Sequence, residues 1–153
     1  LLRDVNSQAG SANQLLTNAG RSAASLRNCR RGLIMALERS VRENRIEIPA
    51  ARNQLAALRR RSNADDQIIS ASFNGIGSRV DNFVQTGAQS SGVEAAIFTR
   101  QVAARTAQQR AVRAATPNVA RARSNQVQLV NADVQQRQLI DRSFGAIDVL
   151  LDG

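Results

Sequence analysis

The side chains in this sequence that could carry chemistry are mainly arginine. All 21 basic residues of the 153-residue chain are arginine, against 12 acidic residues and no histidine, which gives a net charge of +9. A guanidinium stays charged at every accessible pH and presents a planar fork of donors that matches phosphate or carboxylate groups. The composition therefore predicts either contacts with a polyanion such as nucleic acid or ion pairs with acidic side chains of other chains.

The charge is divided into blocks along the chain. Residues 1–61 carry a net charge of +8 and residues 99–123 carry +6, whereas 62–98 carry −3 and 124–153 carry −2. Such blocks favour head-to-tail packing of like chains, and we favour solvated helix faces with interchain pairs over a DNA or RNA surface. The candidate contact residues for DNA or a protein partner are Arg30, Arg31, Arg59, Arg60, Arg61, Arg105, Arg110 and Arg113.

No aromatic residues are interleaved with these arginines, so the sequence offers no platform for base stacking. Any contact with duplex DNA is expected to involve phosphates and to be independent of base sequence. Charge reversal at Arg105, Arg110 and Arg113 is expected to weaken assembly or DNA contact.

Catalytic and metal sites are not predicted. Without histidine or lysine, neither the serines nor Cys29 has an ordinary general base, and Cys29 is interpreted as a small apolar residue. The one adjacent acidic pair, Asp65 and Asp66, would point in different directions on a helix. No group of residues has metal-ligand spacing, and the glycines at 75–77 and 87–92 lack the spacing of a phosphate loop. We expect a non-enzymatic protein with no cofactor and no metal.

Helical periodicity continues through almost all of the chain. One stripe of the first long segment carries Leu26, Leu33, Leu37, Val41 and Ile48. Pro49 predicts the start of a second helix, and Thr116 followed by Pro117 predicts the start of the last one. The expected elements are an irregular segment or short helix over 1–20, a helix over 21–48, a long helix over 49–86 with a possible break at 75–77, a loop over 87–92, and helices over 93–115 and 117–151, the last with a possible interruption at Gly145.

The composition suits helices better than a large core. Only four residues are aromatic, and much of the apolar share is alanine, which favours helix but buries little surface. We therefore expect a single all-α region of elongated helical hairpins, or a bundle of about four to five helices, stabilised as an oligomer. The chain begins at leucine, so we expect it to be part of a longer protein, and no apolar run is long enough to span a membrane.

The order of segments resembles a known family. An arginine- and glutamine-rich first helix, a long second helix that ends in QTGAQSSGV at 85–93, and a return helix with RQVAAR at 100–105 resemble the small internal virion proteins of short-tailed, podovirus-type bacteriophages. The resemblance covers roughly residues 21–115. It implies a ring-like homo-oligomer in the virion interior, packed near the portal and other core proteins, that leaves with the genome and helps form a DNA-translocation conduit through the host envelope. It also implies contact with non-specific double-stranded DNA and with the host membrane.

Two other functions fit the residues themselves. A helical structural adaptor in another large assembly would use the arginines only in protein contacts. A non-specific, arginine-rich DNA-binding protein would act as a small helical dimer and would lose affinity steeply with salt.

Overall fold

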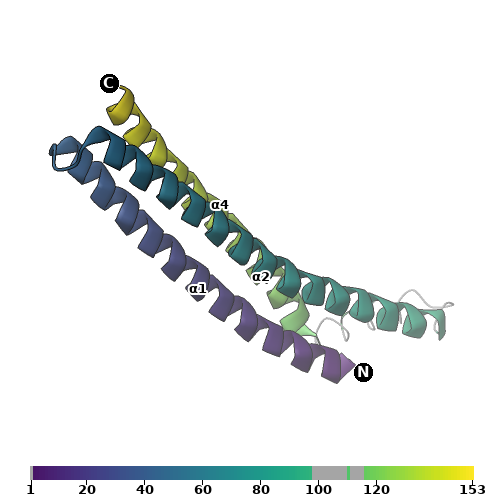
Figure 1. The fold of residues 1–153 in the computed structure, drawn as a ribbon. Coiled ribbons are helices and arrows are strands. Elements are labelled where there is room, and N and C mark those ends of the chain that lie inside the picture. Colours follow the sequence, from purple (N-terminus) through teal and green to yellow (C-terminus); the bar gives the residue numbers. More distant parts are fainter. Residues whose placement is uncertain (1, 98–109, 111–115) are drawn as a thin grey trace. The chain divides into compact units, whose positions relative to one another are not determined.

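The protein is all-helical in the part of the chain that the structure describes. The computed structural model describes residues 2–97, 110 and 116–153, with side chains from 3–83, 85, 110 and 116–153. Three long helices cover these residues: α1 (Leu2–Arg42), α2 (Ile48–Ile97) and α4 (Pro117–Asp152) (Figure 1). The all-α prediction is confirmed.

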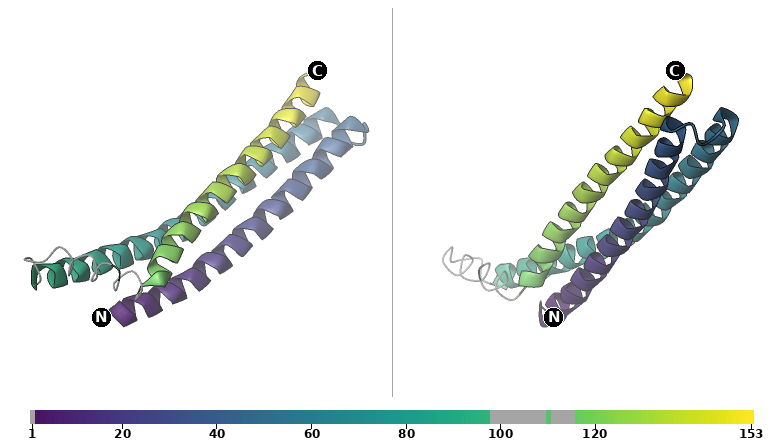
Figure 2. Two further views of the ribbon diagram at one scale, coloured as in Figure 1. Left: turned by 180° about the vertical axis from the view of Figure 1, so that it is seen from behind. Right: turned by 90° about the vertical axis from the view of Figure 1, so that its left-hand side faces the viewer.

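The helices contribute to two compact units. Unit 1 comprises Leu1–Asn18 and Phe73–Leu129, and unit 2 comprises Ala19–Ser72 and Val130–Gly153. Each unit contains a segment of α1, of α2 and of α4. Within unit 2 the three segments lie side by side in both views of Figure 2.

The connection between α1 and α2 in unit 2 is short and well defined. Asn44 has a left-handed backbone, with φ of 53°, and follows the last turn of α1. The Arg45 amide donates to the Ser40 carbonyl at 2.9 Å, and the Asn44 amide donates to the Val41 carbonyl at 3.2 Å. These two bonds form a Schellman cap, which satisfies carbonyls that the end of the helix leaves open.

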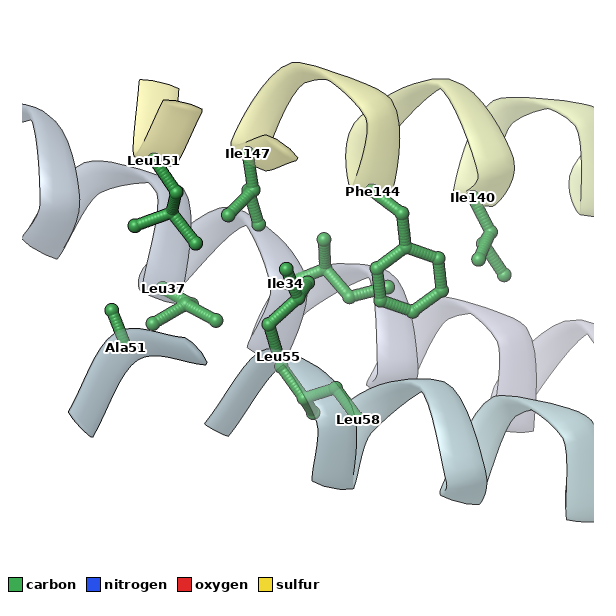
Figure 3. Close-up of a cluster of buried hydrophobic side chains, with 9 residues drawn as sticks. All are labelled: Ile34, Leu37, Ala51, Leu55, Leu58, Ile140, Phe144, Ile147 and Leu151. Carbon is green, nitrogen blue, oxygen red and sulfur yellow. The ribbon is translucent and has the colours of Figure 1, made fainter. Parts of the chain in front are cut away.

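The core of unit 2 is an apolar cluster to which all three helices contribute. Figure 3 shows side chains of α4 spaced by three or four residues that point toward those of α1 and α2. Its members are Ile34, Leu37, Ala51, Leu55, Leu58, Ile140, Phe144, Ile147 and Leu151. Ile34 and Ile147 have no exposed surface, so this cluster accounts for much of the stability that apolar burial supplies to unit 2.

Among its described residues, unit 1 has a small apolar cluster and a set of amide hydrogen bonds between asparagine side chains and backbone. Leu16, Val80 and Ala122 form its apolar cluster, with Ile76 and Leu129 packed against it. Hydrogen bonds of asparagine side chains also join α1 to α4 in this unit. The contacts are Asn13 Nδ2 to the Asn118 carbonyl at 3.2 Å, Asn118 Nδ2 to the Asn6 carbonyl at 3.2 Å, the Asn118 amide to Asn6 Oδ1 at 3.0 Å, and Asn125 Nδ2 to Asn13 Oδ1 at 3.1 Å.

Several predicted boundaries were wrong. Helix α1 is continuous from Leu2, through the segment that was expected to be irregular or a short separate helix, and it ends at Arg42 rather than at residue 48. Helix α2 continues without interruption through 75–77 and through the predicted loop at 87–92 to Ile97. Each glycine in a helix costs only about 1 kcal/mol relative to alanine, which is less than a long packed helix gains elsewhere along its length. Helix α4 likewise runs through Gly145.

Other boundary predictions were right or fall elsewhere. Pro49 lies in the first turn of α2, and α4 begins at Pro117 directly after Thr116, as predicted. Beyond Ile97, the predicted helix over 93–115 lies outside the described residues except for position 110. Within the described residues, none of the helices combines the length and the hydropathy that crossing a bilayer requires.

Candidate functional site

The most distinctive polar site lies in unit 2 and combines six charged side chains. This arginine–aspartate cluster consists of Arg27 and Arg30 on α1, Asp65 and Asp66 on α2, and Asp133 and Arg137 on α4. Its three positive and three negative charges balance. Because every member lies on a long helix, the positions of the guanidinium groups are set by helix packing and not by loops.

Arg27 is the centre of the cluster. Its Nε donates to Asp133 Oδ1 at 3.0 Å and its Nη2 donates to Asp133 Oδ2 at 3.2 Å, while Nη1 donates to Asp66. A bidentate guanidinium–carboxylate pair is among the stronger hydrogen-bonded contacts in proteins. The Arg27 side chain is only 2% exposed. One buried residue of α1 therefore holds both α2 and α4.

Two further ion pairs complete the arginine–aspartate cluster. Arg30 Nε donates to Asp65 Oδ2 at 2.7 Å, and Arg137 Nη2 donates to Asp66 Oδ2 at 3.4 Å. Asp65 and Asp66 thus serve different arginines, in keeping with the expectation that adjacent residues of a helix point in different directions.

The electrostatics of the cluster favour the charged guanidinium. Burial alone lowers the pKa of Arg27, but its hydrogen bonds to Asp133 and Asp66 and the charges of both carboxylates outweigh burial and raise that pKa above its ordinary value. The hydrogen bond to Asp65 raises the pKa of Arg30 in the same way, against a smaller effect of burial. The cluster is therefore an ionic clamp, and removing one partner would leave a buried charge without compensation.

A second set of arginine contacts joins α2 to α4 in the same unit. Arg59 pairs with Asp148 and lies over the ring of Phe144, 5.3 Å from its centroid. Arg52 Nη2 donates to the Leu151 carbonyl at 3.1 Å. Arg59 therefore contributes to helix packing through its charge and through a cation–π contact.

The predicted contact arginines that the structure describes differ in their surroundings. Arg30 and Arg59 hold aspartates of their own chain, Arg31 is half-buried, and Arg60, Arg61 and Arg110 are exposed. Arg105 and Arg113 lie outside the described residues. Of the six described positions, two are thus engaged in contacts that hold helices together.

Sequence reasoning missed Arg27 and its partners. A signal was present: Arg27 falls between Ala23 and Ile34 on the 3–4 spacing of buried positions of α1, and Asp65 falls between Leu58 and Ile69 on that of α2. A charged residue in an apolar stripe must find a partner, so both positions were identifiable as members of internal ion pairs.

An apolar groove opens between α1 and α2 in unit 2. This α1–α2 groove has a volume of about 360 Å³. It is lined by Leu33, Ala36, Leu37 and Ser40 of α1 and by Gln54, Ala57, Leu58 and Arg61 of α2. Of the apolar stripe predicted for this helix, Leu37 is buried, but Leu33 is 42% exposed here because its neighbour Ile34 takes the buried position. Ile48, also assigned to that stripe, is 54% exposed.

Two further observations concern sites that the sequence considered. Cys29 is exposed on α1 and forms no disulfide. It was interpreted as a small apolar residue, but it is not part of the buried core. In the part of the chain that the structure describes, no group of three or more His, Cys, Asp or Glu residues is placed to hold a metal ion.

Comparison with known proteins identified no related protein. No family model matches the chain, and no curated protein or solved structure matches it at a significant level.

Proposed function

We propose that this chain is a structural protein that acts in a larger assembly, where it binds other protein chains along the faces of its helices. The observation that carries the proposal is the α1–α2 groove, which combines an apolar lining with the 42%-exposed Leu33. Grooves of this kind receive an amphipathic helix of a partner in many protein complexes. Packing a helix there would bury Leu33 and stabilise the assembly through the hydrophobic effect.

The internal arginine pairs support the same proposal. Arg27, Arg30 and Arg59 contact aspartates on other helices of their own chain, so part of the unusual arginine content serves to hold helices in register. Bidentate pairing suits arginine better than lysine because the planar fork matches a carboxylate. We propose no catalytic role and no cofactor for the chain.

The more specific form of the proposal comes from the resemblance of residues 21–115 to internal virion proteins of short-tailed bacteriophages. We propose a place in a ring-like internal core near the portal, made of several helices from several copies, and ejection with the genome toward the host envelope. The other virion proteins, packaged DNA and host membrane are its proposed partners. The same helical surfaces would serve an adaptor in a different assembly.

A non-specific DNA-binding function is the second candidate. The observation in its favour is that Arg60, Arg61 and Arg110 are exposed and form no ion pair with any other residue that the structure describes. Such arginines are available for phosphate contacts, whose strength would fall steeply with salt concentration.

Sedimentation of the purified chain in moderate salt, with and without random-sequence duplex DNA, separates these functions. A defined oligomer that forms without DNA is the result expected for the assembly function. A monomer or dimer that gains mass only when DNA is added would overturn it in favour of DNA binding. Leakage from liposomes would then test the proposed conduit role of the oligomer.

A further inference from the structure

We propose that the α1–α2 groove binds the same groove of a second copy of this chain, with the two α2 helices antiparallel and Arg61 of each copy opposite Glu47 of the other. The inference rests on the proposed assembly function and names its first partner. Three observations support this contact: the groove itself, the residues along its α2 wall, and the order of the charged side chains on that wall.

Helix α2 of unit 2 has two stripes with alternating three- and four-residue spacing. One is buried and includes Ala51, Leu55 and Leu58. The other includes Gln54, Ala57 and Arg61, which line the groove, and its positions are exposed except for the half-buried Ala57. It consists of Glu47, Ala50, Gln54, Ala57, Arg61, Ala64, Ile68 and Ala71. This spacing is that of a helix packed against a partner on each of two sides, and only the first partner lies within unit 2.

The second stripe is suited to close contact with another helix. Alanine recurs at every seventh position, at 50, 57, 64 and 71, and small side chains allow two backbones to approach closely. Ile68 on the same stripe is 64% exposed, so a large apolar side chain lies in contact with water. Burial of these positions requires a second helix.

The α1 wall of the groove is uncharged. Of the α1 residues that line it, those at the same three- and four-residue spacing are Leu33, Ala36 and Ser40, with Leu37 beside them. The charged residues Arg31 and Arg39 lie at other positions around this helix. A partner helix can therefore rest on both walls without desolvating a charge from α1.

The charges at the two ends of the α2 wall identify the partner as a second copy. Glu47 directly precedes α2, and Arg61 lies on the same face about four turns later, roughly 21 Å away, with Gln54 halfway between them. Neither Glu47 nor Arg61 forms an ion pair with another described residue of the chain. The wall thus has a negative end and a positive end.

A two-fold axis at Gln54 matches these charges twice. It places Glu47 of each copy beside Arg61 of the other and sets the two Gln54 amides face to face, where each can donate to and accept from its partner. A parallel arrangement would instead bring the two arginines together. Because an isologous contact must be complementary to itself, the order of Glu47, Gln54 and Arg61 favours this geometry over an unrelated partner.

Charge reversal tests the pairing. Measured by sedimentation equilibrium, Arg61→Glu and Glu47→Arg should each raise the dimer dissociation constant by about tenfold, since both ion pairs become repulsive. The double variant Glu47→Arg with Arg61→Glu should return it to near the wild-type value. Arg60→Glu is the matched control, because Arg60 is exposed, changes the net charge equally and lies off the groove-facing stripe.

A disulfide tests the axis directly. In a Cys29→Ser background, Gln54→Cys should form a covalent dimer with oxidised glutathione at low protein concentration, since a residue on the axis meets its own copy. Asn53→Cys, exposed and adjacent but on a different side of α2, should remain mainly monomeric.

The outcomes separate the inference from the function on which it rests. A defined oligomer that is insensitive to both charge reversals and gives no Gln54→Cys disulfide would overturn the groove contact and leave the assembly function standing. A chain that is monomeric at every concentration would overturn the groove contact, and a gain of mass only with DNA would overturn the assembly function as well.

Discussion

Arg27 and Asp133, far apart in the sequence, form a bidentate pair in which Nε lies 3.0 Å from Oδ1 and Nη2 lies 3.2 Å from Oδ2. The pair joins α1 to α4, and the remaining guanidinium nitrogen of Arg27 reaches Asp66 on α2. A single buried side chain thus contacts both other helices of unit 2. Since apolar helix faces can slide past one another with little change in burial, a fixed ion pair of this kind selects one register.

Replacing Arg27 should therefore destabilise unit 2 more than replacing any exposed arginine. Arg27→Ala leaves Asp133, whose side chain is 11% exposed, and Asp66 without their main positive partner. We expect a loss of about 3 kcal/mol in the free energy of unfolding, measured by urea denaturation. Arg39→Ala, in an exposed position of the same helix, is the control and should change it by less than about 0.5 kcal/mol. Equal effects of the two substitutions would mean that the cluster does not hold the helices.

The contribution of Arg27 should not depend on pH near neutrality. Its pKa is raised in the folded chain by Asp133 and Asp66 in spite of burial, so its stabilising effect is present at every pH below the unfolded value. That effect is lost only as the pH rises through the higher folded value, in strongly alkaline solution. The difference in unfolding free energy between the wild type and Arg27→Ala should be constant from about pH 6 to about pH 10. A clear pH dependence within this window would contradict the assignment of Arg27 as a permanently charged partner.

The prediction from sequence succeeded where the signal was local. Helical periodicity, Pro49 and the Thr116–Pro117 start all act within one or two turns, and the structure agrees with each. The glycines at 75–77 were interpreted as a possible break within one long helix and those at 87–92 as a loop, whereas α2 continues through both segments.

Which side chains of unit 2 are buried depends on contacts between helices, and the periodicity of one helix does not show those contacts. The predicted apolar stripe contained Leu33 and Leu37, but Leu33 is exposed, and its neighbour Ile34 is buried beside Leu37. The buried stripe is instead the one that contains Arg27, which becomes favourable only because Asp66 and Asp133 arrive from two other helices.

The start of α4 should depend on a side chain from α1. Asn6 Oδ1 accepts a hydrogen bond from the Asn118 amide at 3.0 Å, in the first turn of α4, where no intrahelical acceptor exists. Asn6→Ala removes this acceptor and should lower the stability of unit 1 by about 1 kcal/mol. Hydrogen exchange of the Asn118 amide is the most direct measurement, and it should become faster. Gln8→Ala, exposed on the same helix, should leave that exchange rate unchanged.

Two glycines of α2 in unit 1 offer a matched test of packing. A methyl group at Gly75 meets nothing within 4 Å, whereas one at Gly77 meets the amide nitrogen of Gln126 on α4. Gly75→Ala should therefore stabilise the chain by about 1 kcal/mol, because alanine loses less backbone entropy in a helix. Gly77→Ala has the same gain in propensity but must displace the flexible end of the Gln126 side chain, so it should stabilise the chain less than Gly75→Ala does, by about 0.5 kcal/mol. Thermal unfolding followed by circular dichroism measures both differences. If Gly77→Ala is the more stable variant, the Gln126 amide does not lie against Gly77.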